Sequence, residues 1–331
     1  MLTQNDSARQ GCASTAGVDP VSTAVSVVIA CYSMARWHGI TNAVRSVVAQ
    51  SVPVDQIIVA VDHNPELVER LRRELPEISV VSYENGPGGA SGARNAGVEL
   101  VATPYTAFLD DDEIAERDWL AALMAPFVDG AVVGTGGRYR AVWASAKPNW
   151  FPDEFGWVVG ESFLGMPVVT SRVRNVWSGN MAVRTEVFRA VGGFRVGFGK
   201  QGNRSQPEDT DLCIRMSEHG QDFHWIYVPT AVIDHEIPQH RSTFRFFLRR
   251  CYSEGKGKVE LRHDENNSDE LSDERSYVRT VLTQGVRRYA GGRNASASKA
   301  AALMAGIGSA GLGAASATAI GLRRSRFPGP S

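Results

Sequence analysis

The sequence predicts an α/β protein with a GT-A type, doubly wound, mostly parallel sheet that has helices on both faces. Short apolar runs rich in β-branched residues alternate with helical segments, and this strand–helix alternation occurs four times between residues 25 and 109. Parallel strands need helical crossovers of this kind, and such crossovers are right-handed. A C-terminal helical extension is expected to follow the sheet.

Four strands are predicted, and the first two are apolar runs expected to be buried, as is typical of parallel sheets. The four strands cover residues 25–30, 56–61, 79–83 and 105–109. Apolar residues at three- and four-residue steps predict helices at 36–50 and 66–75. A further short helix is expected from the glycine-rich loop 86–92 to about residue 101.

Beyond residue 134 the alternation becomes irregular. Aromatic and proline-rich sequence between Trp143 and Pro152 predicts irregular structure over a cleft. Regular structure is expected again at 177–183, in a helix near 208–219 and in a strand at 225–228.

This pattern divides the chain into three parts. Residues 1–24 are expected to be a flexible leader, and residues 25–260 a GT-A domain with a nucleotide-binding half (25–135) and an acceptor half (136–260). The extension 261–331 contains a charged, mobile linker and an Ala/Gly-rich helix. This helix is long enough to span a bilayer, but small residues and glycines favour an amphipathic helix packed on the domain or on a membrane surface.

Composition excludes some classes of protein. The net charge is −1, so no basic field indicates a nucleic-acid partner. The four cysteines form no CxxC pair, which favours a reducing, cytoplasmic location without a disulfide framework. The first residues lack the charged and apolar regions of a signal peptide.

Polar residues follow the predicted strands at the edge where parallel sheets bind ligands. Tyr32 follows the first strand and Asp62 the second, while Asp110, Asp111 and Asp112 follow the fourth. Adjacent carboxylates repel one another, and a divalent metal such as Mn²⁺ or Mg²⁺ would relieve this repulsion and hold a diphosphate. The alternative is a solvated acidic loop or a cap for a helix starting near Glu116.

The glycine-rich loop does not have the GxGxxG spacing of a dinucleotide site. Arg94 and Asn95 follow it at a predicted helix start, where they either face an anion or lie exposed.

Six segments, taken together and in this order, resemble inverting glycosyltransferase family 2, whose members have the GT-A fold. They span residues 25 to about 240, and they are VSVVIACY (25–32), QIIVAVD (56–62), GASGARNAG (89–97), FLDDD (108–112), WSGNMAV (177–183) and PEDTDL (207–212).

The resemblance implies roles for the donor residues. Tyr32 would lie against a pyrimidine base, Asp62 would accept from its ring N–H, and Arg94 would lie near the nucleotide. Asp110 and Asp112 would be the DXD pair, with Asp111 between them on the donor side. Asp112 would bind the metal directly and Asp110 would lie nearer the ribose.

It also implies roles on the acceptor side. Asp209 would be the general base, and His235 would help to hold the metal or diphosphate. The acceptor and diphosphate would lie near five further residues, which are Trp177, Gly179, Asn180, Glu208 and Arg250.

The sequence departs from the family after the second strand. Where the family usually has two adjacent acids, this chain has Val61-Asp62. Where the family usually has Gly-Ser, it has His63-Asn64. UDP or dTDP donors are favoured, but the exact nucleotide stays open.

Structural explanations compete with several of these roles. Glu208, Asp209 and Asp211 could complement a helix dipole, and His235 could be a packed histidine. Arg249, Arg250 and Lys256 could bind a diphosphate or an anionic lipid, or they could form a basic helix face. Three tryptophans could either stack on an acceptor sugar or pack in the core, namely Trp143, Trp150 and Trp157.

The predicted function is metal-dependent transfer of a sugar from a nucleotide-sugar to a glycan or lipid-linked acceptor, as in cell-envelope polysaccharide biosynthesis. The protein would be cytoplasmic or peripheral at the inner face of the cell membrane. A sugar-nucleotide pyrophosphorylase would carry glycines after the first strand, and residues 30–34 have none. A non-catalytic scaffolding protein would be expected to lose Asp112 or Asp209, and both are present.

Overall fold

The computed structural model describes residues 24–197, 199–201, 204–206, 208–264, 277, 284–291 and 295–326. The predicted leader therefore lies outside the described residues except for Ala24. The predicted charged linker does so as well, apart from residues 261–264, which end helix α7.

The first half of the chain forms the parallel part of the sheet, as expected. Strands β1 (Val25–Cys31), β2 (Gln56–Asp62), β3 (Ser79–Tyr83) and β4 (Tyr105–Asp110) pair in parallel in the order β3-β2-β1-β4. The crossovers are α1 (Trp37–Val48), α2 (Pro65–Glu74) and α3 (Ala90–Glu99). Because all four strands run the same way, their carboxyl ends meet at one edge.

Local chemistry fixes where these helices begin. Ser33 caps the 3-10 turn Met34–Arg36 that leads into α1. Asn64 caps α2 by accepting from the Leu67 N–H at 3.0 Å, and Pro65 occupies the first helical position. Gly89 precedes α3 with φ of 146°, a conformation that L side chains rarely adopt.

The second half extends the sheet beyond β4. Strand β8 (Asn180–Arg184) is antiparallel to both β4 and β6 (Val132–Trp143), and β6 is parallel to β11 (His224–Ile237). The short strands β5 (Glu113–Ala115) and β7 (Ser171–Val173) both pair antiparallel with β11. Strands β9 (Gly199–Gln201) and β10 (Arg204–Gln206) form a separate pair.

One expectation about this half was wrong. Regular structure does not end at residue 134, because β6 continues to Trp143. Its glycines hide the strand pattern, and they allow close packing, since a Cβ at Gly134 would lie 2.2 Å from the Trp225 ring. The acidic triplet leads into β5 and not directly into a helix, and α4 (Trp119–Met124) begins later than residue 116.

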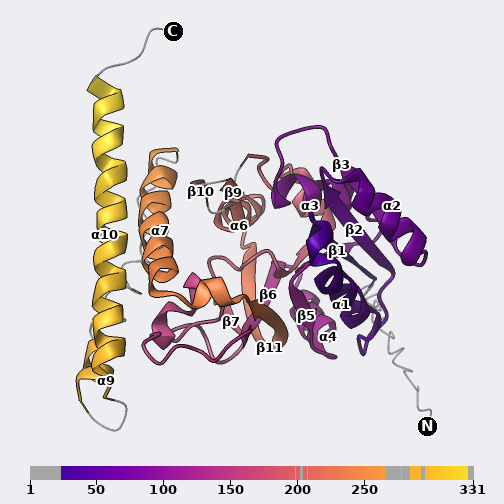
Figure 1. Cartoon of the computed structure of the whole chain (residues 1–331). Helices are drawn as coiled ribbons and strands as arrows, with labels where there is room; N and C mark the ends of the chain where they lie inside the picture. Colours follow the sequence, from indigo (N-terminus) through magenta and orange to yellow (C-terminus); the bar gives the residue numbers. More distant parts are fainter. Residues whose placement is uncertain are drawn as a thin grey trace, which may run out of the picture.

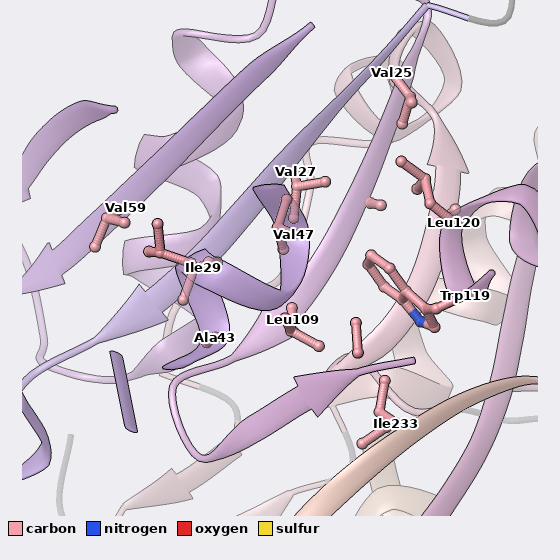
Figure 2. Packing of buried hydrophobic residues seen from close by; sticks show 14 of the residues in the cluster. Val25, Val27, Ile29, Ala43, Val47, Val59, Leu109, Trp119, Leu120 and Ile233 are labelled. Atoms are coloured by element: carbon pink, nitrogen blue, oxygen red, sulfur yellow. The ribbon is translucent and has the colours of Figure 1, made fainter. Parts of the chain in front are cut away.

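The sheet has a core on each face. Strand β1 contributes alternately, with Val27 and Ile29 on one face and Val28 and Ala30 on the other. Helices α1, α2 and α4 cover the first face, where Trp119 lies fully buried (Figure 2). Helices α3, α5 (Thr185–Ala190) and α6 (Glu208–Glu218) cover the other face.

A C-terminal helix, α10 (Ala297–Arg326), is present, as expected. Helices α7 (Phe244–Asp264) and α10 lie side by side at the edge of the molecule, and the short α9 (Val286–Ala290) lies near the start of α10 (Figure 1). A third core holds them to the 3-10 segment Asp153–Val158, and it includes Phe155, Phe247 and Leu303.

Polar contacts add to this attachment. Tyr289 donates to the buried carboxylate of Glu154 at 2.8 Å, and Lys299 pairs with Asp153 at 3.1 Å. Helix α10 therefore packs on the domain. Its stretch Ala297–Ala319 is also long and apolar enough to cross a membrane.

Candidate active site

One cavity of about 1720 Å³ lies at the carboxyl ends of β1, β2 and β4. It brings together most of the predicted site residues, which come from the strand ends, the segment before β8, the start of α6, β11 and α7. They are Tyr32, Asp62, Arg94, Asp110, Asp111, Asp112, Trp177, Gly179, Glu208, Asp209, His235 and Arg250.

Tyr32 and Asp62 lie together at one end of this cavity. Tyr32 is 55% exposed, and the Arg36 guanidinium lies 5.1 Å from the centre of its ring. The Oδ2 atom of Asp62 accepts from the Gly89 N–H at 2.8 Å, and Oδ1 lies 2.6 Å from His63 Nδ1. Asp62 thus holds the glycine-rich loop at the edge of the cavity beside an exposed aromatic ring.

The acidic cluster follows strand β4. Asp110, Asp112 and Glu113 each offer a carboxylate oxygen, and these oxygens lie within 4.8 Å of one another. His235 approaches from β11, with Nε2 at 3.9 Å from Asp112 Oδ2. Its Nδ1 is 2.9 Å from the Gly160 carbonyl oxygen, which fixes the ring orientation. The predicted metal residues Asp110, Asp112 and His235 are therefore close neighbours.

Glu113 was missed by the sequence reasoning, although it directly follows the triplet. Its Oε2 accepts from the Asp110 backbone N–H at 2.9 Å. Gly179 leaves room for this carboxylate, because a Cβ there would lie 2.5 Å from Glu113 Oε1. Burial, followed by the charges of Asp110 and Asp112, raises the pKa of Glu113 well above its usual range.

Asp111 lies beside the cluster. It pairs with Arg36, which also lies 3.2 Å from Asp112 Oδ2. Burial nevertheless raises the pKa of Asp111 to about 7, because the ion pair offsets only part of its desolvation. A set of crowded, partly buried carboxylates with one imidazole fits a hard divalent cation such as Mg²⁺ or Mn²⁺.

Arg94 links this cluster to the start of α6. It is 3% exposed, and its guanidinium donates to Asp110 while its Nε and one terminal nitrogen are buried with no hydrogen-bond partner. The charges of Asp110, Asp209 and Glu208 all act on it. Arg94 is therefore a buried cation among acids, and it does not lie exposed on a helix surface.

Asp209 and Glu208 occupy the first turn of α6 and both line the cavity. Asp209 accepts hydrogen bonds from the Ser178 hydroxyl and backbone N–H, and its Oδ1 is buried without a partner. Burial raises the pKa of Asp209, and Arg94 opposes this rise. Burial and the charge of Asp209 raise the pKa of Glu208 to about 8. Both neighbouring carboxyl groups therefore hold a proton more tightly than an exposed carboxyl group does.

Asn180 is the one predicted site residue that does not line the cavity. It is fully buried, its Oδ1 accepts from Trp119 Nε1 at 2.8 Å, and its Nδ2 donates to the Arg138 and Ala231 carbonyls at 3.1 Å each. Because these bonds turn its amide into the core, the Asn180 side chain lies outside the cavity.

The structure also separates the tryptophans. Trp143 and Trp150 pack against Phe151 in the third core. Trp157 and Trp177 line the cavity. Four arginines that the sequence reasoning missed line it as well, namely Arg36, Arg172, Arg174 and Arg241. Their sequence signal was weak, since none falls within a recognised motif.

Comparisons with known proteins agree with this geometry. The family model of glycosyl transferase family 2 matches residues 26–192. A glucosyl-dolichyl phosphate glucuronosyltransferase of Haloferax volcanii is 32% identical over 238 residues, which cover 71% of this chain and 76% of that protein. Succinoglycan biosynthesis protein ExoM of Rhizobium meliloti is 26% identical over 230 residues, 66% of this chain and 70% of that protein.

A solved structure supports the fold alone. The crystal structure of GalNAc-T7 with UDP, GalNAc and Mn²⁺ is similar with a TM-score of 0.52 at 15% sequence identity. The similarity covers 77% of this chain and 54% of that chain, so this chain spans about half of it.

The fold and the cavity define a glycosyltransferase of the GT-A type, as the sequence predicted. The chain belongs to glycosyl transferase family 2, because the family model covers half of it and a relative above 30% identity extends the match. The family match ends at residue 192, before α6, so the role of Asp209 is still a proposal.

Proposed function

We propose that the protein transfers a sugar, with inversion, from a UDP- or dTDP-sugar to a glycan or lipid-linked acceptor. The observation that carries this proposal is that one cavity contains the acidic cluster and Asp209, with the buried cation Arg94 acting on both. Inverting transfer needs a leaving-group site and a base on either side of the reacting carbon.

The donor lies at the end formed by β1, β2 and β4. Tyr32 offers an exposed ring to the base, and the Asp62 carboxylate can accept from the ring N–H of uracil or thymine. Asp110, Asp112, Glu113 and His235 would hold a Mn²⁺ or Mg²⁺ ion. When bound, this ion offsets the charge of the leaving diphosphate.

The acceptor lies between Asp209 and the tryptophans of the cavity. Asp209 takes the proton of the acceptor hydroxyl while its oxygen bonds to the anomeric carbon and the carbon–diphosphate bond breaks. The hydrogen bonds from Ser178 hold one side of the Asp209 carboxyl group and leave Oδ1 for the proton. Trp157 and Trp177 offer rings on which a sugar can stack.

The location that fits this chemistry is the cytoplasm or the inner face of the cell membrane. The apolar helix α10 and its terminal arginines support peripheral contact with an anionic membrane, which would bring a lipid-linked acceptor within reach.

The direct test is a transfer and donor-hydrolysis screen with UDP-, dTDP- and GDP-sugars, each with Mn²⁺, Mg²⁺ or EDTA. Turnover of UDP- or dTDP-sugars that requires the metal supports the proposal. Full turnover in EDTA, or turnover of GDP-sugars alone, contradicts it.

A further inference from the structure

The active-site cavity continues past Asp209 to the C-terminal helices. On α7 the lining residues recur every four residues, namely Arg250, Glu254 and Lys258, with Gly255 and Val259 beside them. On α10 the lining residues form a single stripe at helical spacing, consisting of Ile307, Ala310, Gly311 and Ala314. One wall of the cavity is therefore the seam between these two helices.

This seam is narrow and formed by small residues. A Cβ at Gly255 would lie 2.0 Å from the Ala310 carbonyl oxygen, and a Cβ at Gly313 would lie 2.0 Å from that of Tyr252. The helices thus meet backbone to backbone. The α10 side of the seam is apolar, whereas the α7 side carries Arg250, Glu254 and Lys258. Across the cavity, Ile214 and Phe223 add further apolar surface.

Two cations lie where the seam joins the catalytic part of the cavity. Arg241 and Arg250 both line the cavity. Burial and the like charges of Arg36 and Arg250 lower the pKa of Arg241, whereas the charge of Asp112 opposes this shift. Within the described part of the chain, Arg250 forms no ion pair and Arg241 makes one hydrogen bond, to the Val159 carbonyl at 3.5 Å.

Helix α10 carries positive and no negative side chains, which agrees with an anionic ligand in the seam. Between residues 297 and 326 the sequence contains no acidic residue, and Arg323, Arg324 and Arg326 end the helix. Met304 and Leu312 are exposed on it. The helix therefore combines an apolar surface with positive charge, which suits an anionic amphiphile.

We infer that the acceptor is a saccharide joined through a phosphate to a lipid. Its sugar hydroxyl lies at Asp209, its phosphate lies against Arg241 and Arg250, and its hydrocarbon chain leaves along the seam between α7 and α10. This inference rests on the proposed function and specifies its acceptor. A free glycan would gain little from a stripe of small apolar residues, whereas a hydrocarbon chain buries apolar area there. The two arginines supply the charge-assisted hydrogen bonds that a phosphate needs.

Two glycines of α10 provide a matched test. Gly311 is on the lining stripe and Gly308 is off it, and a Cβ at either position would meet nothing within 4 Å. Leucine therefore fits at both positions and favours the helix more than glycine does. Only the Gly311→Leu side chain would obstruct the seam.

Binding is measured by calorimetry on the full chain with UDP and Mn²⁺ present, using farnesyl phosphate, farnesol and inorganic phosphate as probes. Farnesyl phosphate should bind at least about tenfold tighter than farnesol or inorganic phosphate. Gly311→Leu should weaken farnesyl phosphate by about tenfold or more, and Gly308→Leu should leave it unchanged. Arg250→Gln should weaken farnesyl phosphate but not farnesol, and the exposed Arg245→Gln should weaken neither.

UDP affinity is measured on every variant. A variant that still binds UDP is folded, so its weaker binding of farnesyl phosphate reports on the seam. Farnesyl phosphate that binds no tighter than inorganic phosphate overturns the inference, as do equal affinities in the two glycine variants. If farnesyl phosphate fails in this way but the enzyme glycosylates a free glycan, the acceptor assignment is wrong and the proposed function stands. If no UDP- or dTDP-sugar is turned over at all, the proposed function fails first.

Discussion

The guanidinium of Arg94, on helix α3, hydrogen-bonds the carboxylate of Asp110 at the end of strand β4. This contact places a buried positive charge between the acidic cluster and the first turn of α6. Because Arg94 also acts on Asp209, it couples the electrostatics of the proposed metal site to those of the proposed base.

Replacing Arg94 should shift the pH dependence of catalysis. Arg94 lowers the pKa of Asp209, so its removal raises that pKa. A carboxyl base acts when deprotonated, and the acid limb of the kcat/KM profile should therefore move to higher pH in Arg94→Gln. Loss of a buried ion partner also costs about 3–5 kcal/mol of stability.

The control for this destabilisation is Arg189→Gln. It removes partly buried hydrogen bonds from the exposed Arg189 to the Val98 and Val101 carbonyls, and Arg189 does not line the cavity. An unchanged acid limb in folded Arg94→Gln protein would show that Arg94 does not act on the base.

Glu113 should contribute to metal binding although it lies outside the DXD triplet. Its carboxylate is buried within reach of Asp110 and Asp112. Glu113→Gln should weaken Mn²⁺ binding by about tenfold or more, measured by calorimetry with UDP present. Glu116→Gln, which changes a partly exposed partner of Arg140, is the matched control. Equal Mn²⁺ affinity in both variants would remove Glu113 from the site.

Asp62 should select the donor base. The structure places it against the Gly89 N–H and near the exposed Tyr32 ring. Asp62→Ala should weaken UDP binding by about 1–3 kcal/mol and reduce the preference for UDP over GDP. Calorimetry with UDP, dTDP and GDP gives the comparison, and Glu84→Ala on the adjacent loop is the control. Wild-type protein that binds GDP tighter than both other nucleotides refutes the assignment.

Glu208 should make stability depend on pH. Its pKa rises from 4.5 to about 8 on folding, because burial disfavours its charge. A raised carboxyl pKa stabilises the fold below the unfolded value, and this contribution is lost as pH rises toward 8. Glu208→Gln removes this dependence. The Tm of the variant minus the Tm of wild type should therefore increase as the pH is raised from about 5 to about 8. Thermal unfolding with EDTA present tests this, and a pH-independent difference would contradict it.

The parallel half of the sheet could be predicted from sequence because its central strands β1 and β4 are almost wholly buried and carry mostly apolar runs. Strand β1 shows this, with all seven residues buried. Strand β6 could not be predicted in full, because Gly134, Gly136 and Gly137 are there for close packing against residues distant in the chain.

The candidate site was predictable where residues follow strand ends. Asp62 and Asp110 end β2 and β4, and the cavity contains both. Asn180 was misplaced because a motif does not show which way a side chain points, and its amide turns inward to Trp119. Arg241 and the lining of α10 were missed because only tertiary packing brings them to the cavity.

The measurement that tests the central claim most directly compares two adjacent acids, Asp209 and Glu208. Asp209→Asn keeps the size of the side chain but cannot accept a proton near neutral pH, so kcat should fall by about 10²–10⁴ while the donor Kd changes little. Glu208→Gln imitates the protonated group that its raised pKa favours, and should keep kcat within about tenfold of wild type. If Asp209→Asn stays within about tenfold of wild type while Glu208→Gln is inactive, Asp209 is not the base.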